Sequence, residues 1–189
     1  MPVTQPSSNN ILGTLGPAYS FHDILCREKI SYLQVRYFSS FETIFEALEK
    51  NDIQTALVAT SNSIHGKVGA NSEVISSLNL KTLEIFELPI SLHLAAKAPI
   101  ELRNIKKIYA HPVAWNECQS FLGNHNIEHH HSSSNSQALI DLEKVDETKS
   151  AAISGREAIK QSELKLIYED IHDTEPNITT FALVAKDNS

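Results

Sequence analysis

Residues 34–62, QVRYFSSFETIFEALEKNDIQTALVATSN, contain the pattern that decides the fold. Residues 34–38 and 55–59 are short apolar runs with β-branched members, and they predict two strands. Between them, apolar side chains recur at helical spacing after Ser40, a residue type that caps helices, and this predicts an amphipathic helix. The apolar face of that helix would consist of Phe41, Ile44, Phe45 and Leu48. A strand, a helix and a strand in succession are typical of layered α/β proteins.

The same alternation continues on both sides of this unit. Residues 11–15 predict a strand that ends at Gly16-Pro17, and Ser20 can cap the helix that follows. Toward the C-terminus, strands are predicted at residues 105–110, near Ile127, at 151–154 and at 165–168, and helices at 114–122 and 136–145. This second group therefore repeats the order of elements of the first.

Two extended stretches connect the groups. Residues 81–96 predict a β stretch, interrupted near Pro89, that crosses from the first group to the second, and residues 179–185 predict a strand that returns. We therefore expect two small α/β subdomains with a ligand cleft between the lobes. The predicted division is 1–9 as a disordered tail, 10–92 plus 174–189 as the first subdomain, and 93–173 as the second.

The composition limits the class of partner. The 189 residues carry a formal net charge of -7 and are 41% hydrophobic, which is typical of a globular protein and unfavourable for binding a nucleic-acid backbone. No apolar run approaches the roughly 20 residues of a membrane-spanning helix. Cys26 and Cys118 are isolated thiols in a chain without a secretion signal. We expect a cytoplasmic protein with a small-molecule ligand and no nucleic-acid or membrane partner.

Several polar segments follow predicted strands, where α/β proteins hold their ligands. Residues 61–67, SNSIHGK, gather hydroxyl, amide, imidazole and ammonium groups that can orient a carboxylic acid. The turn and helix start at residues 13–23 can hold an anion with backbone N–H groups. Taken separately, each segment is equally typical of a surface loop or a capped helix. The same holds for His111 before a predicted helix and for the hydroxyls of residues 179–180 in a strand.

Three consecutive histidines, His129 to His131, raise the question of a metal site. Side chains in an extended segment alternate between two faces, so these three cannot all bind one ion. The glycines near residue 16 lack the third glycine of a nucleotide-binding loop. We expect no metal site and no nucleotide cofactor.

Five segments, read in order, resemble the catalytic domain of prephenate dehydratases from about residue 10 to about residue 187. They are Leu15-Gly16-Pro17; Asn62-Ser63 with Gly66 and Val68, in that family's Glu-Asn-Ser-x-x-Gly-x-Val loop; His111-Pro112 with Ala114 and Cys118, in its Ser-His-Pro-Gln-Ala-x-x-Gln-Cys helix start; Ala151-Ala152-Ile153 with Ala158; and Asn177, Thr179 and Phe181, in its Asn-x-Thr-Arg-Phe signature. One match would carry little weight, but five in order are fairly specific.

The resemblance implies a two-lobed, periplasmic-binding-protein-like fold and a lyase that acts on prephenate, a dicarboxylate, without metal or organic cofactor. Such enzymes remove carbon dioxide and the ring hydroxyl together and give phenylpyruvate for phenylalanine biosynthesis. Thr179 stands at the signature Thr, which implies that it donates a proton or hydrogen bond to the leaving hydroxyl. The substrate-binding residues so implied are Ser20, Asn62, Ser63, His65, Gly66, His111, Thr180 and Phe181. A homodimer is expected, and the family's regulatory ACT domain is not.

Some letters of the motifs differ. Thr180 replaces the signature Arg, and Ser61 replaces the loop Glu. Tyr19-Ser20-Phe21-His22 replaces a Gly-Thr-Phe-Ser run, and Ala110 and Val113 replace the helix-start Ser and Gln. A charge-assisted hydrogen bond from an Arg to a carboxylate is worth about 1.5 to 3 kcal/mol, so binding or turnover should suffer unless another cation takes over. The candidates for this replacement are Lys67, His65, His22 and His111.

Two other functions remain open. One is a non-aromatising prephenate decarboxylase of a secondary-metabolite pathway, which would keep the ring hydroxyl. The other is a non-catalytic homologue that binds a carboxylate. The Thr at position 179 favours dehydration, whereas the missing Arg and Glu favour divergence.

Overall fold

The computed structural model describes residues 10–31 and 33–187, and the chain forms two compact units. Among the described residues, unit 1 comprises 10–17, 21–89 and 178–187, and unit 2 comprises 18–20 and 90–177. Each unit has its own sheet and its own core, so the predicted α/β fold of two small subdomains is confirmed. The expected tail at 1–9 lies outside the described residues, and the subdomain boundaries at 92/93 and 173/174 remain predictions.

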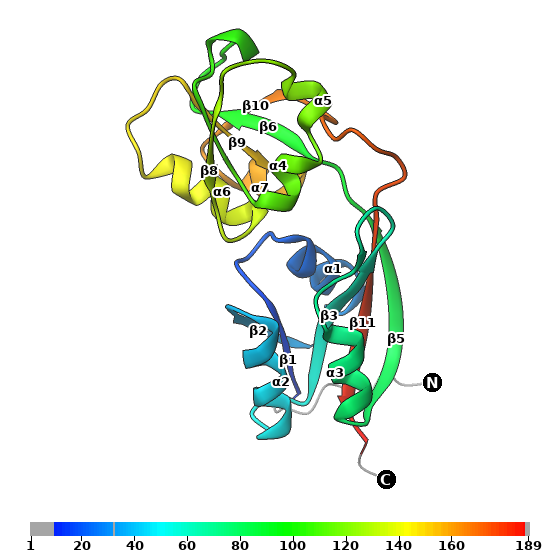
Figure 1. Cartoon of the computed structure of the whole chain (residues 1–189). Coiled ribbons are helices and arrows are strands. Elements are labelled where there is room, and N and C mark those ends of the chain that lie inside the picture. Colours follow the sequence, from blue (N-terminus) through cyan, green and yellow to red (C-terminus); the bar gives the residue numbers. More distant parts are fainter. Residues whose placement is uncertain (1–9, 32, 188–189) are drawn as a thin grey trace. The chain divides into compact units, whose positions relative to one another are not determined.

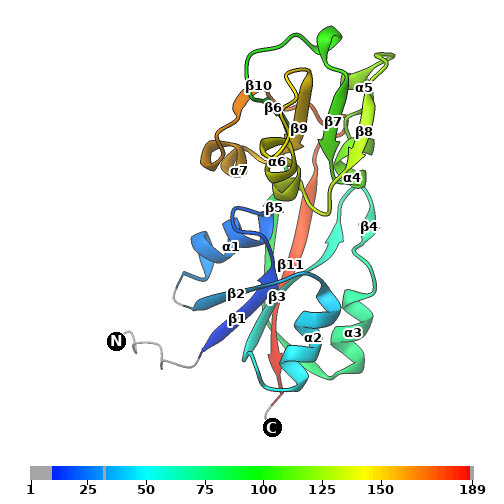
Figure 2. The ribbon, with the colours of Figure 1, turned by 90° about the vertical axis from the view of Figure 1, so that its left-hand side faces the viewer.

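Unit 1 is built on a six-stranded mixed sheet with the order β2-β1-β3-β11-β5, and β4 pairs with the end of β3 (Figures 1 and 2). Its strands are β1 (Ile11–Leu15), β2 (Gln34–Phe38), β3 (Thr55–Asn62), β4 (Gly66–Lys67), β5 (Leu80–Pro89) and β11 (Ile178–Lys186), and its helices are α1 (Phe21–Lys29), α2 (Phe41–Glu49) and α3 (Asn71–Ser77). Strand β1 runs parallel to both of its neighbours, and β11 runs antiparallel to β3 and β5. The strand expected to return to the first sheet therefore does so.

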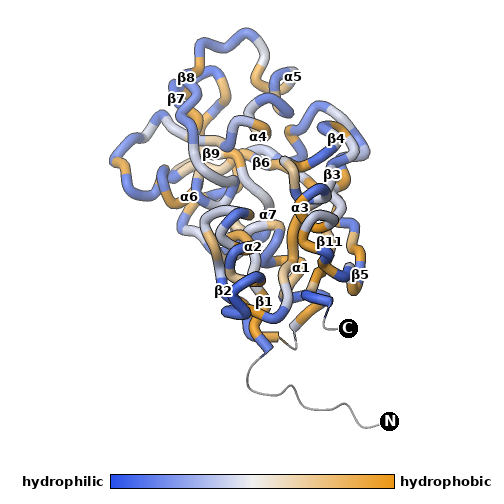
Figure 3. Tube along the Cα trace, turned by 60° about the horizontal axis from the view of Figure 1, so that its bottom comes forward, coloured by the Kyte–Doolittle hydropathy of each residue, from blue (hydrophilic) through white to orange (hydrophobic). Residues whose placement is uncertain are grey.

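Helices cover both faces of this sheet. Residues of α2 and α3 pack with Ala182 and Val184 of β11, and residues of α1 pack on the other face with Phe181 and Leu183. Helix α2 begins as predicted, because the Ser40 hydroxyl accepts a hydrogen bond from the backbone N–H of Thr43 at 3.3 Å. In Figure 3 the hydrophobic colouring follows much of β1 and β11.

Unit 2 contains a five-stranded sheet with the order β10-β6-β9-β7-β8. Its elements are β6 (His93–Ala96), the short helix Leu102–Asn104, β7 (Lys107–Ala110), α4 (Pro112–Asn116), α5 (Gln119–Leu122), β8 (Glu128–His131), α6 (Asn135–Glu143), β9 (Ser150–Ser154), α7 (Arg156–Gln161) and β10 (Lys165–Tyr168). Strands β8 and β9 are parallel to β7, whereas β6 is antiparallel to β9 and β10. The predicted repeat of strands and helices is therefore present.

Three predicted elements differ from the structure in number or by more than two residues at one end. The stretch 81–96 is two strands, since β5 ends at Pro89, which has no N–H to continue a ladder, and β6 starts at His93 in the other sheet. The helix expected over 114–122 is α4 and α5, because the N–H of Cys118 bonds to the carbonyl of Trp115 and tightens the turn. Strand β3 continues past Ala59 to Asn62.

Both cysteines are buried free thiols, as expected. Burial raises the pKa of Cys26 to about 12 and also raises that of Cys118, so neither forms a thiolate near neutral pH. None of the helices in the described ranges has both the length and the apolar character needed to cross a membrane.

Candidate active site

The polar segment expected to be a loop begins inside the sheet of unit 1. Residues Ser61 and Asn62 are the last of β3, and they pair with Lys67 and Gly66 of β4 in a tight hairpin. The Asn62 side-chain oxygen accepts hydrogen bonds from the backbone N–H groups of Ile64 at 2.8 Å and His65 at 3.1 Å. This Asx turn fixes the Asn62 amide with its NH2 group available for a partner across the sheet.

That partner is Thr179. Asn62 and Thr179 are directly opposed in the β3–β11 ladder, and Asn62 Nδ2 donates to Thr179 Oγ1 at 3.1 Å. Ser63 forms two further hydrogen bonds between the end of β3 and the start of β11. Its N–H donates to the carbonyl of Ile178 at 2.8 Å, and its Oγ accepts from the N–H of Ile178 at 2.9 Å. The structure therefore brings the predicted site residues Asn62 and Ser63 next to Thr179, which is more than 110 residues away in the sequence.

Thr180 lies on the opposite face of the sheet from Thr179, because successive side chains of a strand alternate. Its direct partner in β3 is Ser61. The family's motifs have Arg at the position of Thr180 and Glu at the position of Ser61. These two positions are therefore cross-strand neighbours. On its other side, Thr180 is opposed to Glu87 of β5.

Phe181 is a core residue of unit 1. Its side chain is 1% exposed and packs with Leu12, Leu25 and Leu57. In the structure the Phe181 ring packs in the core, two residues along β11 from Thr179. A direct contact between Phe181 and the substrate stays a prediction.

His65 and Gly66 form the turn between β3 and β4. His65 is exposed, and Gly66 has a φ of +75°, a conformation that favours glycine. Lys67, one of the cations considered as a replacement for the missing Arg, forms an ion pair with Glu73. A role of His65 and Gly66 in substrate binding remains a prediction.

His22 does not supply a positive charge at neutral pH. Its ring packs edge-on against Phe181, with centroids 4.9 Å apart, and tilted against Phe41 at 5.7 Å. The loss of hydration in this aromatic setting lowers the pKa of His22 from 6.5 to about 4. A lowered pKa disfavours His22 as the cation that replaces the missing Arg, and the identity of that replacement stays a prediction.

Ser20 and His111 belong to unit 2. Ser20 directly precedes α1, and His111 caps α4, where its Nδ1 accepts a hydrogen bond from the N–H of Val113 at 3.3 Å. Burial lowers the pKa of His111, which favours a neutral imidazole and a capping role. Substrate binding by either residue remains a prediction.

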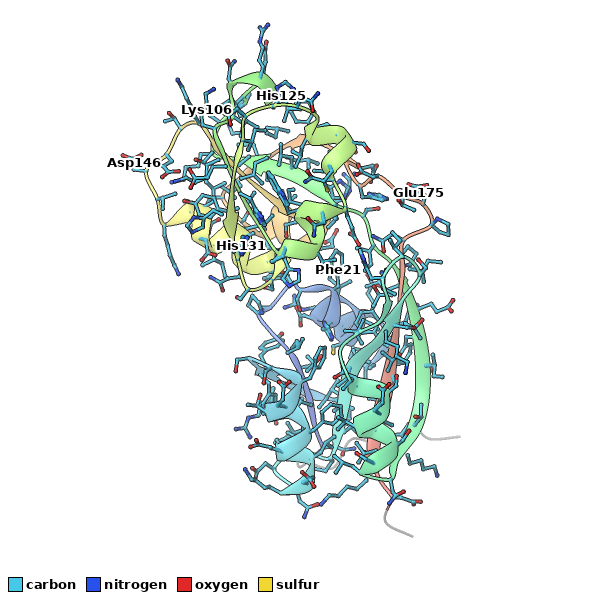
Figure 4. The ribbon with its side chains drawn as sticks, viewed as in Figure 1. Phe21, Lys106, His125, His131, Asp146 and Glu175 are labelled. Atoms are coloured by element: carbon cyan, nitrogen blue, oxygen red, sulfur yellow. The ribbon has the colours of Figure 1, made fainter. Side chains whose placement is uncertain are left out.

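The three consecutive histidines lie on β8, and their side chains alternate as expected for a strand. His129 stacks on Trp115 with ring centroids 4.4 Å apart and lies 4.3 Å from the ring of His131, which is labelled in Figure 4, while His130 packs on Tyr109. Within the ranges described, no group of three or more His, Cys, Asp or Glu side chains is placed to hold a metal ion.

Two features were missed from the sequence. Asn177, one of the residues that carry the resemblance, is buried in unit 2 and donates Nδ2 to the Glu117 carboxylate at 3.1 Å. The pairing of Asn62 with Thr179 also depends on the continuation of β3 beyond Ala59. Residues Thr60 to Asn62 are typical of turns, so only the pairing with β11 and β4 reveals them as strand.

The chemistry of this end of unit 1 follows from the hydrogen bonds of Thr179. A hydroxyl group can donate one hydrogen bond while its oxygen accepts others. Since Thr179 Oγ1 accepts from Asn62 Nδ2, the Thr179 proton can be donated to an oxygen of a ligand. The arrangement can therefore bind, and help to expel, a hydroxyl leaving group.

Comparison of the sequence with known proteins shows the family of this chain. The sequence profile described as Prephenate dehydratase matches residues 12–189. A similar curated protein is the bifunctional chorismate mutase/prephenate dehydratase of Buchnera aphidicola subsp. Schizaphis graminum, 26% identical over 148 residues that cover 78% of this chain and 38% of the relative. The match covers 38% of that relative and 62% of the prephenate dehydratase of Lactococcus lactis subsp. cremoris, which is 27% identical over 176 residues. The chain therefore spans about half the length of the curated relatives it matches.

Solved structures agree on the fold. Prephenate dehydratase from Arthrobacter aurescens, solved in complex with L-Phe, has a TM-score of 0.83 and 25% identity, covering 95% of this chain and 60% of that one. A putative methionine-binding lipoprotein from Bacillus subtilis has a TM-score of 0.50 and 9% identity, covering 95% and 84%. The second likeness concerns the fold alone and agrees with the expected periplasmic-binding-protein-like architecture.

Proposed function

The chain belongs to the prephenate dehydratase family, and on that premise we propose that it is a lyase that converts prephenate into phenylpyruvate. The observation that carries this proposal is the 3.1 Å hydrogen bond from Asn62 Nδ2 to Thr179 Oγ1. It holds the hydroxyl at the motif position expected to assist the leaving group. Both residues sit at strand ends, where the backbone fixes their positions.

In the proposed reaction, the bond between the ring and its carboxylate breaks and carbon dioxide leaves. The electron pair of that bond moves into the ring, which becomes aromatic as the bond to the ring hydroxyl breaks. The departing hydroxyl takes the proton of Thr179 Oγ1, which is replaced from solvent, and leaves as water. Thr179 donates the hydrogen bond that assists this departure, and Asn62 holds the Thr179 oxygen in place. Positioned proton donation of this kind contributes about 100- to 10,000-fold to a rate.

The remaining features of the proposal rest on the resemblance. The substrate is a dicarboxylate, no metal or organic cofactor takes part, and the protein acts in phenylalanine biosynthesis as a cytoplasmic homodimer. The names of the relatives support the reaction alone. The other predicted substrate-binding residues stay predictions: Ser20, Ser63, His65, Gly66, His111, Thr180 and Phe181.

Product analysis tests the proposed function. The purified protein is incubated with prephenate, and the products are identified by proton NMR and by ultraviolet absorbance. We expect phenylpyruvate, recognised by its aromatic protons. A dihydro-hydroxyphenylpyruvate would identify a decarboxylase instead, and binding of prephenate without conversion would identify a non-catalytic carboxylate-binding protein.

A further inference from the structure

Unit 2 contains a cavity of about 370 Å³ that is open to solvent. It lies where the parallel strands β7, β8 and β9 begin, at Lys107, Glu128 and Ser150. Lys106, labelled in Figure 4, directly precedes β7 and also lines the cavity. Its N–H donates to the carbonyl of Lys149 at 2.8 Å, and its carbonyl accepts from the N–H of Glu128 at 2.8 Å, so the sheet fixes the walls. The volume lies in the range of small-molecule sites, about 300 to 1,000 Å³.

One ion pair occupies part of the lining. Lys107 Nζ lies 3.0 Å from Glu147 Oε1, and Glu147 Oε2 accepts a hydrogen bond from Ser150 Oγ at 2.6 Å. The hydrogen bond from Ser150 and the contact with Lys107 lower the pKa of Glu147, and Glu147 raises the pKa of Lys107. Both groups therefore stay charged at neutral pH, and their charges compensate each other.

Two other ammonium groups of the lining remain for a ligand. Lys106 and Lys149 are exposed and form no ion pair with any residue that the structure describes. Glu128, also exposed, is the one carboxylate of the lining that likewise has no ion-pair partner among the described residues. These free groups carry a net positive charge in a chain whose formal net charge is -7. A locally positive concavity raises the local concentration of small anions.

The polar lining indicates the class of anion. Sites for apolar ligands are lined mainly by hydrophobic and aromatic side chains, whereas this cavity is lined by Lys, Glu, Thr and Ser. A phosphate group accepts hydrogen bonds on several oxygens, so it suits two ammonium groups together with the hydroxyl of Thr148. Glu128 repels a bare phosphate ion, but its carboxylate can accept hydrogen bonds from hydroxyl groups next to a phosphate.

We propose that this cavity binds a small phosphate monoester with hydroxyl groups, its phosphate held by Lys106 and Lys149 and a hydroxyl held by Glu128. The inference does not depend on the proposed lyase function. Thr179 belongs to unit 1, and within unit 2 His111 follows the carboxyl end of β7, whereas the cavity lies at its amino end.

Calorimetry at about 0.15 M ionic strength tests the site with glucose 6-phosphate as the probe. We expect a dissociation constant below about 1 mM, about fivefold weaker binding of inorganic phosphate, and no measurable binding of glucose or gluconate. Lys106→Gln and Lys149→Gln remove one charge each and should each weaken binding of the probe about fivefold. Lys165→Gln, on exposed Lys165 of β10, is the matched control and should leave it unchanged. Glu128→Gln should bind inorganic phosphate more tightly, because it removes a repulsive charge.

Several results would overturn the inference. They are no binding of glucose 6-phosphate, unchanged affinity in either Lys106→Gln or Lys149→Gln, and an equal loss in Lys165→Gln, which would reflect net charge alone. Gluconate or inorganic phosphate bound as tightly as the probe would refute the phosphate monoester as ligand. In NMR spectra, the probe should shift the amide signals of residues 106–107, 128 and 147–150. Shifts around Thr179 instead would place the probe in the proposed active site and refute this cavity.

Discussion

At the scale of single residues, burial decides what the histidines of this protein can do. The sequence shows that His22 follows a turn and could carry a charge, but its neighbours Phe41 and Phe181 come from other parts of the chain. The neutral state therefore could not be predicted without the packing. The proposal of Thr179 as the hydroxyl that assists the leaving group came from its motif, because that pattern is local.

The buried imidazole predicts a pH dependence of the free energy of unfolding. In the unfolded chain His22 titrates near 6.5, and in the folded protein burial lowers its pKa to about 4. Between these values the unfolded state binds the extra proton, so the free energy of unfolding falls as the pH drops from 6.5 to 4, by up to about 3 kcal/mol. Urea denaturation of the wild type and of His22→Phe should diverge over this range. Parallel pH curves for the two proteins would contradict the prediction.

Tyr19 has a φ of 65°, in the left-handed region that favours glycine. The family run has Gly at this position, and here the Tyr19 ring packs against the core of unit 2. Tyr19→Gly and Tyr19→Ala both remove the ring, but only Gly relieves the backbone. We expect Tyr19→Gly to have the higher free energy of unfolding by about 1 kcal/mol. Chemical denaturation measures the difference, and an equal or lower value for Gly would exclude strain at this residue.

At the scale of elements, apolar periodicity predicted which segments are strands and helices. It predicted the residues at which these elements end less accurately. Strands β1, β2 and β10 have the predicted limits, because apolar runs bounded by turn residues leave little choice. The end of β3 was missed, since its last three residues are polar and become strand only through hydrogen bonds to β11 and β4. Pairing between distant segments is not visible in a local pattern.

The β3–β11 ladder places the two motif positions that lack their charges directly opposite each other. Ser61 and Thr180 are directly opposed, so a Glu and an Arg at these positions would form a cross-strand ion pair. In a double-mutant cycle, Ser61→Glu and Thr180→Arg should show a favourable coupling of about 0.5 kcal/mol in the free energy of unfolding. Thr82→Glu with Thr180→Arg is the control, because Thr82 is opposed to Val184. Equal coupling in both cycles would refute the pairing.

At the scale of the whole molecule, the two units have separate cores. In unit 1 the Ser40 hydroxyl caps α2, and in unit 2 the Ser134 hydroxyl caps α6 by accepting from the N–H of Gln137 at 3.1 Å. The two-part organisation could be predicted because both halves repeat the same alternation of elements. The grouping of site residues could be predicted only through motifs, since spacing alone does not bring Asn62 to Thr179.

Separate cores predict separate local responses to the loss of a cap. Ser40→Ala and Ser134→Ala should each lower the free energy of unfolding by about 1 kcal/mol. In native-state hydrogen exchange, we expect Ser40→Ala to accelerate exchange mainly in α2 and its sheet, and Ser134→Ala mainly in α6 and its sheet. Equal acceleration across both units by either substitution would show that they unfold as one.

The central claim is that the Thr179 hydroxyl, held by Asn62, assists the departure of the substrate hydroxyl. The most direct measurement is kcat for prephenate in Thr179→Val, which keeps the shape and removes the hydroxyl, with Thr179→Ser as the rescue and Thr82→Val on β5 as the matched control. We predict a 100- to 10,000-fold loss for Thr179→Val in a protein that is still folded at the assay temperature, and much of the activity retained in Thr179→Ser. Wild-type kcat in Thr179→Val would contradict the account.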